Sequence, residues 1–154
     1  MPKVIGVIRT RGTVKVPRNV KVTLERMKLN RRHSMLIQYD SPTLRGMIKA
    51  AEPYLAWGEV DRELLVNLLS KRGRFRGGRR LGADELKLLG CSTIEELADS
   101  ILEKGELKKH VANGLSNVFG LTPPSGGFKA DLHRPASQKG VWGAHEHLTP
   151  LVAR

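Results

Sequence analysis

Apolar side chains in the first sixty residues follow two spacings, one typical of strands and one typical of helices. Val4–Ile8 is a nearly continuous apolar run, as in a strand that is covered on both faces. After Pro17, and again after Ser41-Pro42, apolar residues recur every three or four positions, and proline suits the first turn of a helix. The expected elements are, in order, a strand at Val4–Ile8, a helix from Pro17, a strand at Met35–Tyr39, a helix from Pro42 and a strand at Tyr54–Trp57. This order predicts a small α+β unit over residues 1–60.

The pattern changes after residue 60. Four leucines between residues 64 and 69 indicate a helix, and Ser92-Thr93-Ile94-Glu95 resembles a capping box that opens another. A short helical piece near Asp84–Leu89 is expected between them, so residues 61–113 are predicted to be helical. Glycine and proline then dominate. Val118–Leu121 could form one last strand, and residues 128–147 show no clear period, so we expect this tail to be ordered by packing or by RNA.

Charge is high and unevenly distributed. The 154 residues carry a formal net charge of +12, which indicates nucleic acid or an anionic surface as the partner. Residues 1–60 hold 12 basic and 4 acidic side chains, and residues 61–80 hold 7 and 2. Residues 81–115 reverse the sign, with 4 basic and 7 acidic side chains. The first eighty residues are therefore expected to face the polyanion.

The strongest local feature is the run from Lys71 to Arg80, which we call the basic loop. Six of its ten residues are Lys or Arg, three are Gly and none is acidic. Burying several unpaired like charges would be very unfavourable, so this run needs either solvent or a polyanion. A solvated loop is the alternative, but the charge of the rest of the chain favours the polyanion.

Other chemistry finds little support in the sequence. The glycines of the basic loop do not form a phosphate-binding motif behind a strand. His145 and His147, with His133 upstream, are expected to be surface residues, because their spacing and the absence of Cys companions are poor for a metal site. The single cysteine, Cys91, excludes an internal disulfide and has no adjacent basic partner. We expect no catalytic residues and no cofactor, and no apolar run approaches the roughly 18 residues that span a bilayer.

Arginines near predicted turns are the best candidates for RNA contacts, because turns can present guanidinium groups to backbone phosphates. Some of them could serve solubility alone. The expected RNA-binding residues are Arg9, Arg11, Lys15, Arg18, Arg31, Arg32, Arg45, Lys71, Arg72, Arg74, Arg76, Arg79, Arg80, Lys129 and Arg134.

Several short segments together resemble the universal ribosomal protein L-thirty family, whose eukaryotic counterpart is called L-seven. They are Val7-Ile8-Arg9-Thr10-Arg11-Gly12, Thr23-Leu24, Leu29-Asn30-Arg31-Arg32, Leu44-Arg45-Gly46-Met47-Ile48 and Trp57-Gly58-Glu59. Bacterial members resemble residues 1–60 only. Archaeal members continue through a helical segment to a Pro-Pro-x-Gly-Gly element, matched here by Pro123 to Gly127.

The resemblance implies a three-stranded antiparallel sheet, in the order 3-1-2, with two helices on one face. It divides the chain into a core at residues 1–60 and an archaeal-type extension at 61–154. It also implies a cytoplasmic, non-enzymatic constituent of the large (50S) ribosomal subunit, present in one copy. Such a protein would bind large-subunit ribosomal RNA near the 5S RNA, beside other ribosomal proteins. A free-standing nucleic-acid module, such as an RNA chaperone or chromatin protein, is the alternative.

Overall fold

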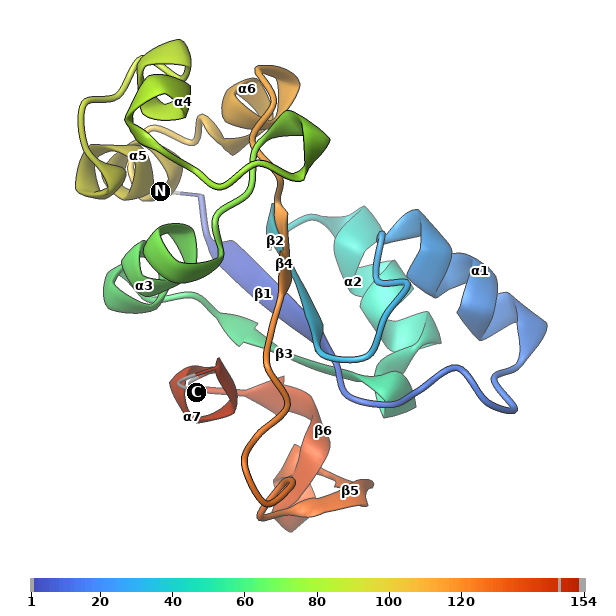
Figure 1. Cartoon of the computed structure of the whole chain (residues 1–154). Helices are drawn as coiled ribbons and strands as arrows, with labels where there is room; N and C mark the ends of the chain where they lie inside the picture. Colours follow the sequence, from blue (N-terminus) through green and yellow to red (C-terminus); the bar gives the residue numbers. More distant parts are fainter. Residues whose placement is uncertain (1, 147, 153–154) are drawn as a thin grey trace.

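The computed structural model describes residues 2–146 and 148–152 and contains the elements labelled in Figure 1. The strands are β1 (Val4–Arg9), β2 (Ser34–Tyr39), β3 (Leu55–Glu59), β4 (Val118–Gly120), β5 (Asp131–Pro135) and β6 (Gly140–His145). The α-helices are α1 (Arg18–Arg26), α2 (Pro42–Ala50), α3 (Arg62–Arg72), α4 (Ala83–Leu88), α5 (Ile94–Leu102), α6 (Leu107–Ala112) and α7 (Thr149–Val152). Short 3-10 turns occupy Glu52–Tyr54, Arg76–Gly78 and Ala136–Gln138.

All six strands belong to one mixed sheet in the order β4-β2-β1-β3-β6-β5. β1 pairs antiparallel with β2 and β3, β4 pairs antiparallel with β2, and β6 lies parallel to β3. The α+β class is confirmed, and the expected order 3-1-2 is present as the centre of the sheet. The expectation of only three strands is wrong, because β4 lengthens one edge and the tail adds β6 and β5 to the other.

Helices cover both faces of the central strand β1, as its continuous apolar run predicted. All six of its residues are buried, and alternate side chains point to opposite faces of the sheet. Ile5 and Val7 belong to one cluster with Leu24 of α1 and Ile48 of α2. α2 begins as expected, since the hydroxyl oxygen of Ser41 accepts a hydrogen bond from the backbone N–H of Leu44. Two helices on one face are therefore confirmed.

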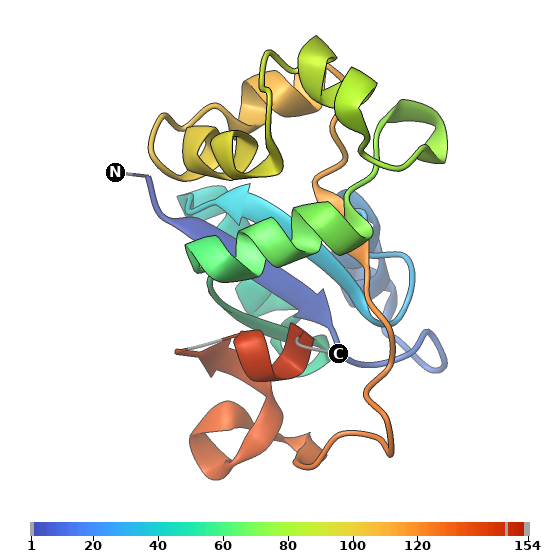
Figure 2. The same ribbon diagram turned by 60° about the vertical axis from the view of Figure 1, so that its left-hand side comes forward.

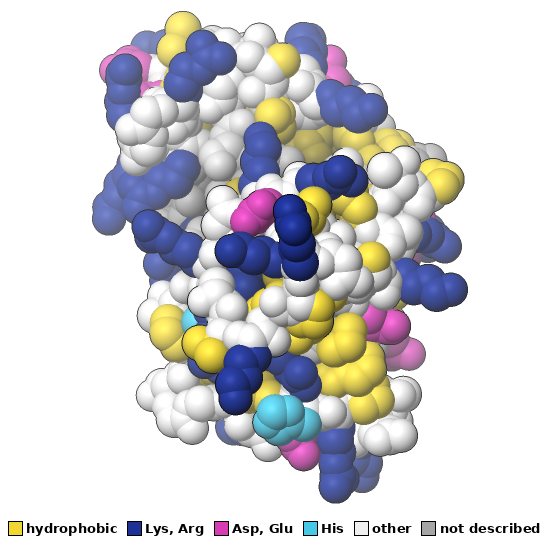
Figure 3. Space-filling model, turned by 90° about the vertical axis from the view of Figure 1, so that its right-hand side faces the viewer, with side chains coloured by type: hydrophobic (Ala, Val, Ile, Leu, Met, Phe, Trp, Pro, Cys, Tyr) yellow, Lys and Arg dark blue, Asp and Glu magenta, His cyan; other side chains and the backbone are white. Residues whose placement is uncertain are grey.

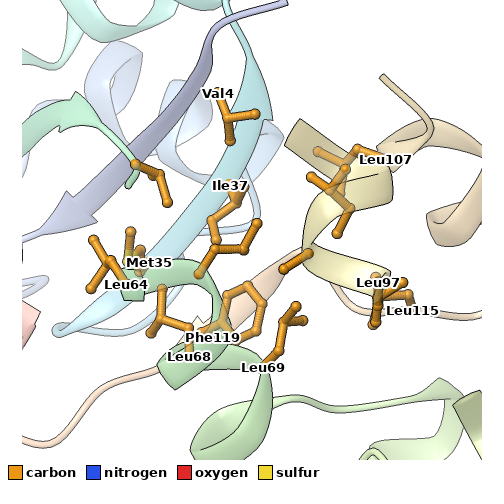
Figure 4. Close-up of a cluster of buried hydrophobic side chains, with 14 of the residues drawn as sticks. Val4, Met35, Ile37, Leu64, Leu68, Leu69, Leu97, Leu107, Leu115 and Phe119 are labelled. Carbon is orange, nitrogen blue, oxygen red and sulfur yellow. The ribbon is translucent and has the colours of Figure 1, made fainter. Parts of the chain in front are cut away.

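The second face is covered by the segment after residue 60 (Figure 2). Leucines on one side of α3 pack there with Ile101 of α5 and with Phe119 of β4. Figure 4 shows the ring of Phe119 beside Leu68 and Leu69. Val4 and Ile8 of β1 belong to the same cluster, so residues on both sides of position 60 build one core.

The tail completes this core. Leu148 is fully buried and packs against Gly6, the one residue of β1 without a side chain. A Cβ atom at Gly6 would lie 2.8 Å from Leu148 Cδ1 and 2.9 Å from Val60 Cγ2, and it would also clash with Met35. The glycine therefore leaves the space that the tail fills.

Candidate nucleic-acid interface

Loops from distant parts of the sequence gather at one edge of the sheet, namely the edge formed by the ends of its strands and not by an outermost strand. Because neighbouring strands in the centre are antiparallel, β1 ends where β2 and β3 begin, and β4 ends at the same edge. We call this edge the loop end; it comprises residues 10–17, 27–33 and 121–130. The basic loop follows α3 on the same side of the molecule, where Figure 2 shows these segments one above another.

Arg9, at the end of β1, is only 4% exposed and is not presented to the surface. Its Nε donates to the carbonyl oxygen of Arg11 at 3.0 Å, Nη1 to that of Leu29 at 2.6 Å, and Nη2 to that of Gly12 at 3.2 Å. Burial lowers the pKa of this guanidinium from its ordinary value. Arg9 therefore shapes the loop, and its guanidinium has little exposed surface for a phosphate.

Arg11 is half-buried and joins the first loop to the tail. Its Nη2 donates to the carbonyl oxygen of Leu132 at 3.0 Å and lies 3.3 Å from Nδ1 of His133. Its guanidinium carbon lies 5.6 Å from the ring centroid of Tyr54, a cation–π distance. Arg11 thus connects three segments and keeps only part of its surface for a partner.

The second loop carries two exposed arginines. Arg32 Nε donates to the carbonyl oxygen of Thr10 at 3.0 Å, while Arg31 extends from the same turn. The ring of His33 stacks on that of Phe128, with the centroids 5.7 Å apart, and this contact holds the tail against the loop. Lys129, the next residue after Phe128, is exposed.

The basic loop is a folded turn that packs Phe75 against the core and exposes most of its cationic side chains. Arg74 and Arg80 pair as an isolated antiparallel bridge, and Gly77 and Gly78 have φ angles of 81° and 77°, a region that favours glycine. Arg72 donates to the hydroxyl oxygen of Thr122, which ties α3 to the loop end. The exposed cationic residues of the basic loop are Lys71, Arg74, Arg76, Arg79 and Arg80.

Two other expected residues already have carboxylate partners. Arg45 on α2 donates to Asp40, with 2.7 Å between Nε and Oδ1, and this pair lowers the pKa of the Asp40 carboxyl. Arg134 Nε lies 3.4 Å from an oxygen of Asp131. By contrast, Lys15 and Arg18 are exposed beside the loop end. Figure 3 shows Lys and Arg side chains distributed widely over the side that carries α1 and α2.

Sequence reasoning missed a hollow between residues 10–17 and α1. It has a volume of about 230 Å³ and is lined by Arg9, Thr13, Val16, Lys21, Leu24, Glu25 and Asn30. These residue types form no motif, and only the folded loop brings them together.

The structure also places the cysteine and most of the histidines that the sequence singled out. In the described part of the chain, no group of three or more His, Cys, Asp or Glu residues could hold a metal ion. His145 is half-buried, with Nε2 2.7 Å from the carbonyl oxygen of Val141, whereas His147 lies outside the described residues. Cys91 is a free thiol whose pKa is raised by burial. Within the same residues, no helix is long and apolar enough to cross a bilayer.

The chain is similar to known proteins of the ribosome. The family model described as "Ribosomal protein L30p/L7e" matches residues 5–55. The chain is 36% identical to a protein of Sulfurisphaera tokodaii and 38% identical to one of Staphylothermus marinus, covering all of this chain and 99% of each relative. It is 38% identical to a protein of Archaeoglobus fulgidus, covering 90% of this chain and 91% of the relative. Each of these relatives is named "Large ribosomal subunit protein uL30".

Proposed function

Since the chain belongs to the ribosomal protein L30p/L7e family, we propose that its loop end and basic loop form the RNA-binding side of a ribosomal structural protein. The protein is a constituent of the large ribosomal subunit and acts in translation, in the cytoplasm. Its role is structural and not enzymatic, and ribosomal RNA is its partner, together with neighbouring ribosomal proteins.

The observation that carries the interface is the gathering of basic segments far apart in the sequence. Residues 10–17, 27–33 and 121–130 share one edge of the sheet, and Arg72 links the basic loop to Thr122 there. Contacts to phosphate supply much of the affinity in such complexes, and folded RNA is recognised largely by shape. The loop end presents exposed Lys and Arg from three segments, and the basic loop, which pairs with residues 115 and 116 ahead of β4, adds a further group beside them. Such an arrangement suits this kind of partner.

The contacts divide the candidates into four groups. Those proposed to bind RNA are Lys15, Arg18, Arg31, Arg32, Lys71, Arg74, Arg76, Arg79, Arg80 and Lys129, which are all exposed. Arg11 and Arg72 are proposed to contact RNA while they hold the loops in place. Arg45 and Arg134 would need to share their charge with a carboxylate, so we place them at the margin, and Arg9 is left out.

Three finer points belong to the same proposal. We place the protein near the 5S RNA and assign it one copy per subunit. We also keep the division at residue 60, with residues 1–60 as the core and 61–154 as an extension that covers its second face and lengthens its sheet. The acidic stretch within residues 81–115 then faces solvent or protein.

Crosslinking in assembled particles tests this proposal. The protein should sediment with large subunits under associating salt, and ultraviolet crosslinks to ribosomal RNA should fall in residues 10–17, 27–33, 71–80 and 121–130. Crosslinks concentrated on α4 and α5 would overturn the proposed side. A pool that stays entirely free of subunits would favour the free-standing nucleic-acid module.

A further inference from the structure

The hollow between residues 10–17 and α1 is a preformed site with an apolar wall and polar edges. The half-buried Val16 supplies most of the aliphatic surface, because Leu24 also lines the hollow but is only 1% exposed, while Asn30 and Glu25 supply an amide and a carboxylate. Three of the five N–H groups of Arg9 hold the carbonyl oxygens of Arg11, Gly12 and Leu29. These hydrogen bonds fix the loop that forms one side of the hollow, so the site exists before any partner binds.

We infer that this hollow receives one unstacked nucleobase of the bound RNA. This inference rests on the proposed function and extends it from phosphate contacts to a base contact. A base has two apolar faces and an edge of hydrogen-bond donors and acceptors, and proteins recognise unstacked RNA bases through both. Val16 can contact a face, and Asn30, which carries both a donor and an acceptor, can bind the edge.

Size and charge favour a base of a longer RNA over a free small molecule. The volume of about 230 Å³ is below the roughly 300–1,000 Å³ of ordinary small-ligand sites. A base attached to an RNA chain needs less enclosure, because its backbone is held separately. Lys21 lines the hollow, and Lys15 and Arg18 are exposed close by in the sequence, so cationic groups are available for the flanking phosphates.

The alternative occupant is a side chain of another ribosomal protein. Lys15, Arg18 and Lys21 outnumber the single carboxylate of Glu25, and this excess favours a polyanion. Loss of RNA binding in a variant whose hollow is filled separates the two occupants.

Thr13→Trp fills the hollow from its exposed margin without changing the net charge. Its matched control is Val14→Trp, at the adjacent loop position, which is 83% exposed and does not line the hollow. The probe is deproteinised large-subunit ribosomal RNA, titrated with the full chain at several salt concentrations. Thr13→Trp should weaken binding by about 10-fold or more, as expected for the loss of one base contact. The slope of log K against log salt should stay unchanged, because no phosphate contact is removed.

A second pair of variants tests the polar edge. Asn30→Leu removes the amide at similar size and should weaken binding about 5-fold or more, whereas Asn19→Leu, exposed on α1, should not. Thermal unfolding checks that each variant folds.

In the wild-type chain, the methyl NMR signals of Val16 and Leu24 should shift with nucleoside 5′-monophosphates and not with ribose 5-phosphate.

The outcomes separate this inference from the function on which it rests. If wild-type protein binds the RNA but Thr13→Trp and Asn30→Leu bind equally well, the base site is wrong and the phosphate interface stands. Methyl signals that respond equally to ribose 5-phosphate also overturn it. If wild-type protein fails to bind the RNA at all, the proposed function itself fails.

Discussion

Arg9 Nη1 donates a 2.6 Å hydrogen bond to the carbonyl oxygen of Leu29, and so joins the end of β1 to the loop after α1. The other guanidinium nitrogens hold the carbonyl oxygens of Arg11 and Gly12. One buried cation therefore sets the shape of two loops of the loop end. The guanidinium of Arg9 binds backbone carbonyl groups inside the protein, so the RNA contacts proposed for the loop end depend on the neighbouring exposed residues.

Replacing Arg9 should destabilise the fold. Arg9→Met keeps an apolar stem but leaves three carbonyl oxygens without their donor, and the one of Leu29 is buried, where an unsatisfied acceptor costs about 1–3 kcal/mol. The free energy of unfolding, measured with chemical denaturant, should fall by about 1–3 kcal/mol, since the carbonyl oxygens of Arg11 and Gly12 are only partly buried and can bind water. Arg18→Met, at an exposed position, should change it by less than about 0.5 kcal/mol. Equal losses in the two variants would show that the hydrogen bonds of Arg9 contribute little.

The helices on the first face can be tested at their centres. Leu24 is 1% exposed and Ile48 is 3% exposed, and both pack with Ile5 and Val7. Leu24→Ala and Ile48→Ala should each lower the free energy of unfolding by about 2–5 kcal/mol, because each leaves a cavity in the core. Losses below about 0.5 kcal/mol in both variants contradict this packing, and exposed Glu103→Ala serves as the control.

The basic loop should contribute affinity and little stability. Replacing its four exposed arginines (Arg74, Arg76, Arg79 and Arg80) by Ala removes candidate phosphate ligands from the surface. Fewer counterions are then released on binding. The slope of log K against log salt should flatten by up to about 3 units, at roughly 0.7–0.9 per lost contact. The measurement is a titration of large-subunit ribosomal RNA at four or more salt concentrations.

A control of equal charge is available on the helical segment. Replacing the four exposed lysines at 87, 104, 108 and 109 by Ala removes the same number of positive charges from α4 to α6 and their connections. If net charge alone governed binding, both variants would flatten the slope equally. The proposed interface requires that only the variant in the basic loop does so. An unchanged slope and affinity in that variant would mean that the basic loop is only a solvated turn.

A buried histidine should make stability depend on pH. His110 is 2% exposed, and its Nε2 lies 2.6 Å from the hydroxyl oxygen of Ser100, which donates in turn to Glu106. Because the Ser100 hydroxyl directs its proton to Glu106, its oxygen accepts from Nε2–H of His110. A second proton on His110 would therefore go to Nδ1, which is buried without a partner. Burial accordingly lowers the pKa of His110, although Glu106 opposes the shift.

The direction of the pH effect follows from this lowered pKa. The unfolded chain takes up a proton at His110 near pH 6.5, while the folded chain takes it up only at lower pH. Stability should therefore be complete above about pH 6.5 and decrease as the pH falls below it. His110→Gln should reduce that dependence by up to about 1.4 kcal/mol per pH unit, measured by denaturant unfolding between pH 7.5 and 5.5. His33, whose pKa is also lowered by burial, adds a slope of the same sign, which must persist in the variant. An identical pH dependence in variant and wild type would falsify this role.

The elements of residues 1–60 could be predicted because local signals and burial agree there. Ser41-Pro42 is a cap and a first-turn proline, and the structure uses both. The run in Val4–Ile8 requires cover on two faces, which α1, α2 and the later helices provide. Outside residues 1–60, the helix start expected at residues 92–95 is also present. Thr93 caps α5, and the carboxylate of Glu96 accepts a hydrogen bond from the backbone N–H of Ser92.

The strands of the tail could not be predicted from their own residues. Asp131–Pro135 is mostly exposed and lacks alternation, and Gly140–His145 is defined by its parallel pairing with β3. Such partners are distant in the sequence and leave no local period. The same limit applies to Arg9, which by composition belongs on the surface. Only the meeting of three carbonyl oxygens makes its burial favourable.

The packing of Leu148 over Gly6 also has a consequence for biosynthesis. A chain is made from its N-terminus, so the central strand β1 emerges long before Leu148, the side chain that covers Gly6 on its second face. Until then Gly6 and its neighbours Met35 and Val60 have one uncovered side. The nascent protein must therefore leave this part of its second face open until residue 148 has been added, although α3, α5 and β4 cover the rest of that face earlier.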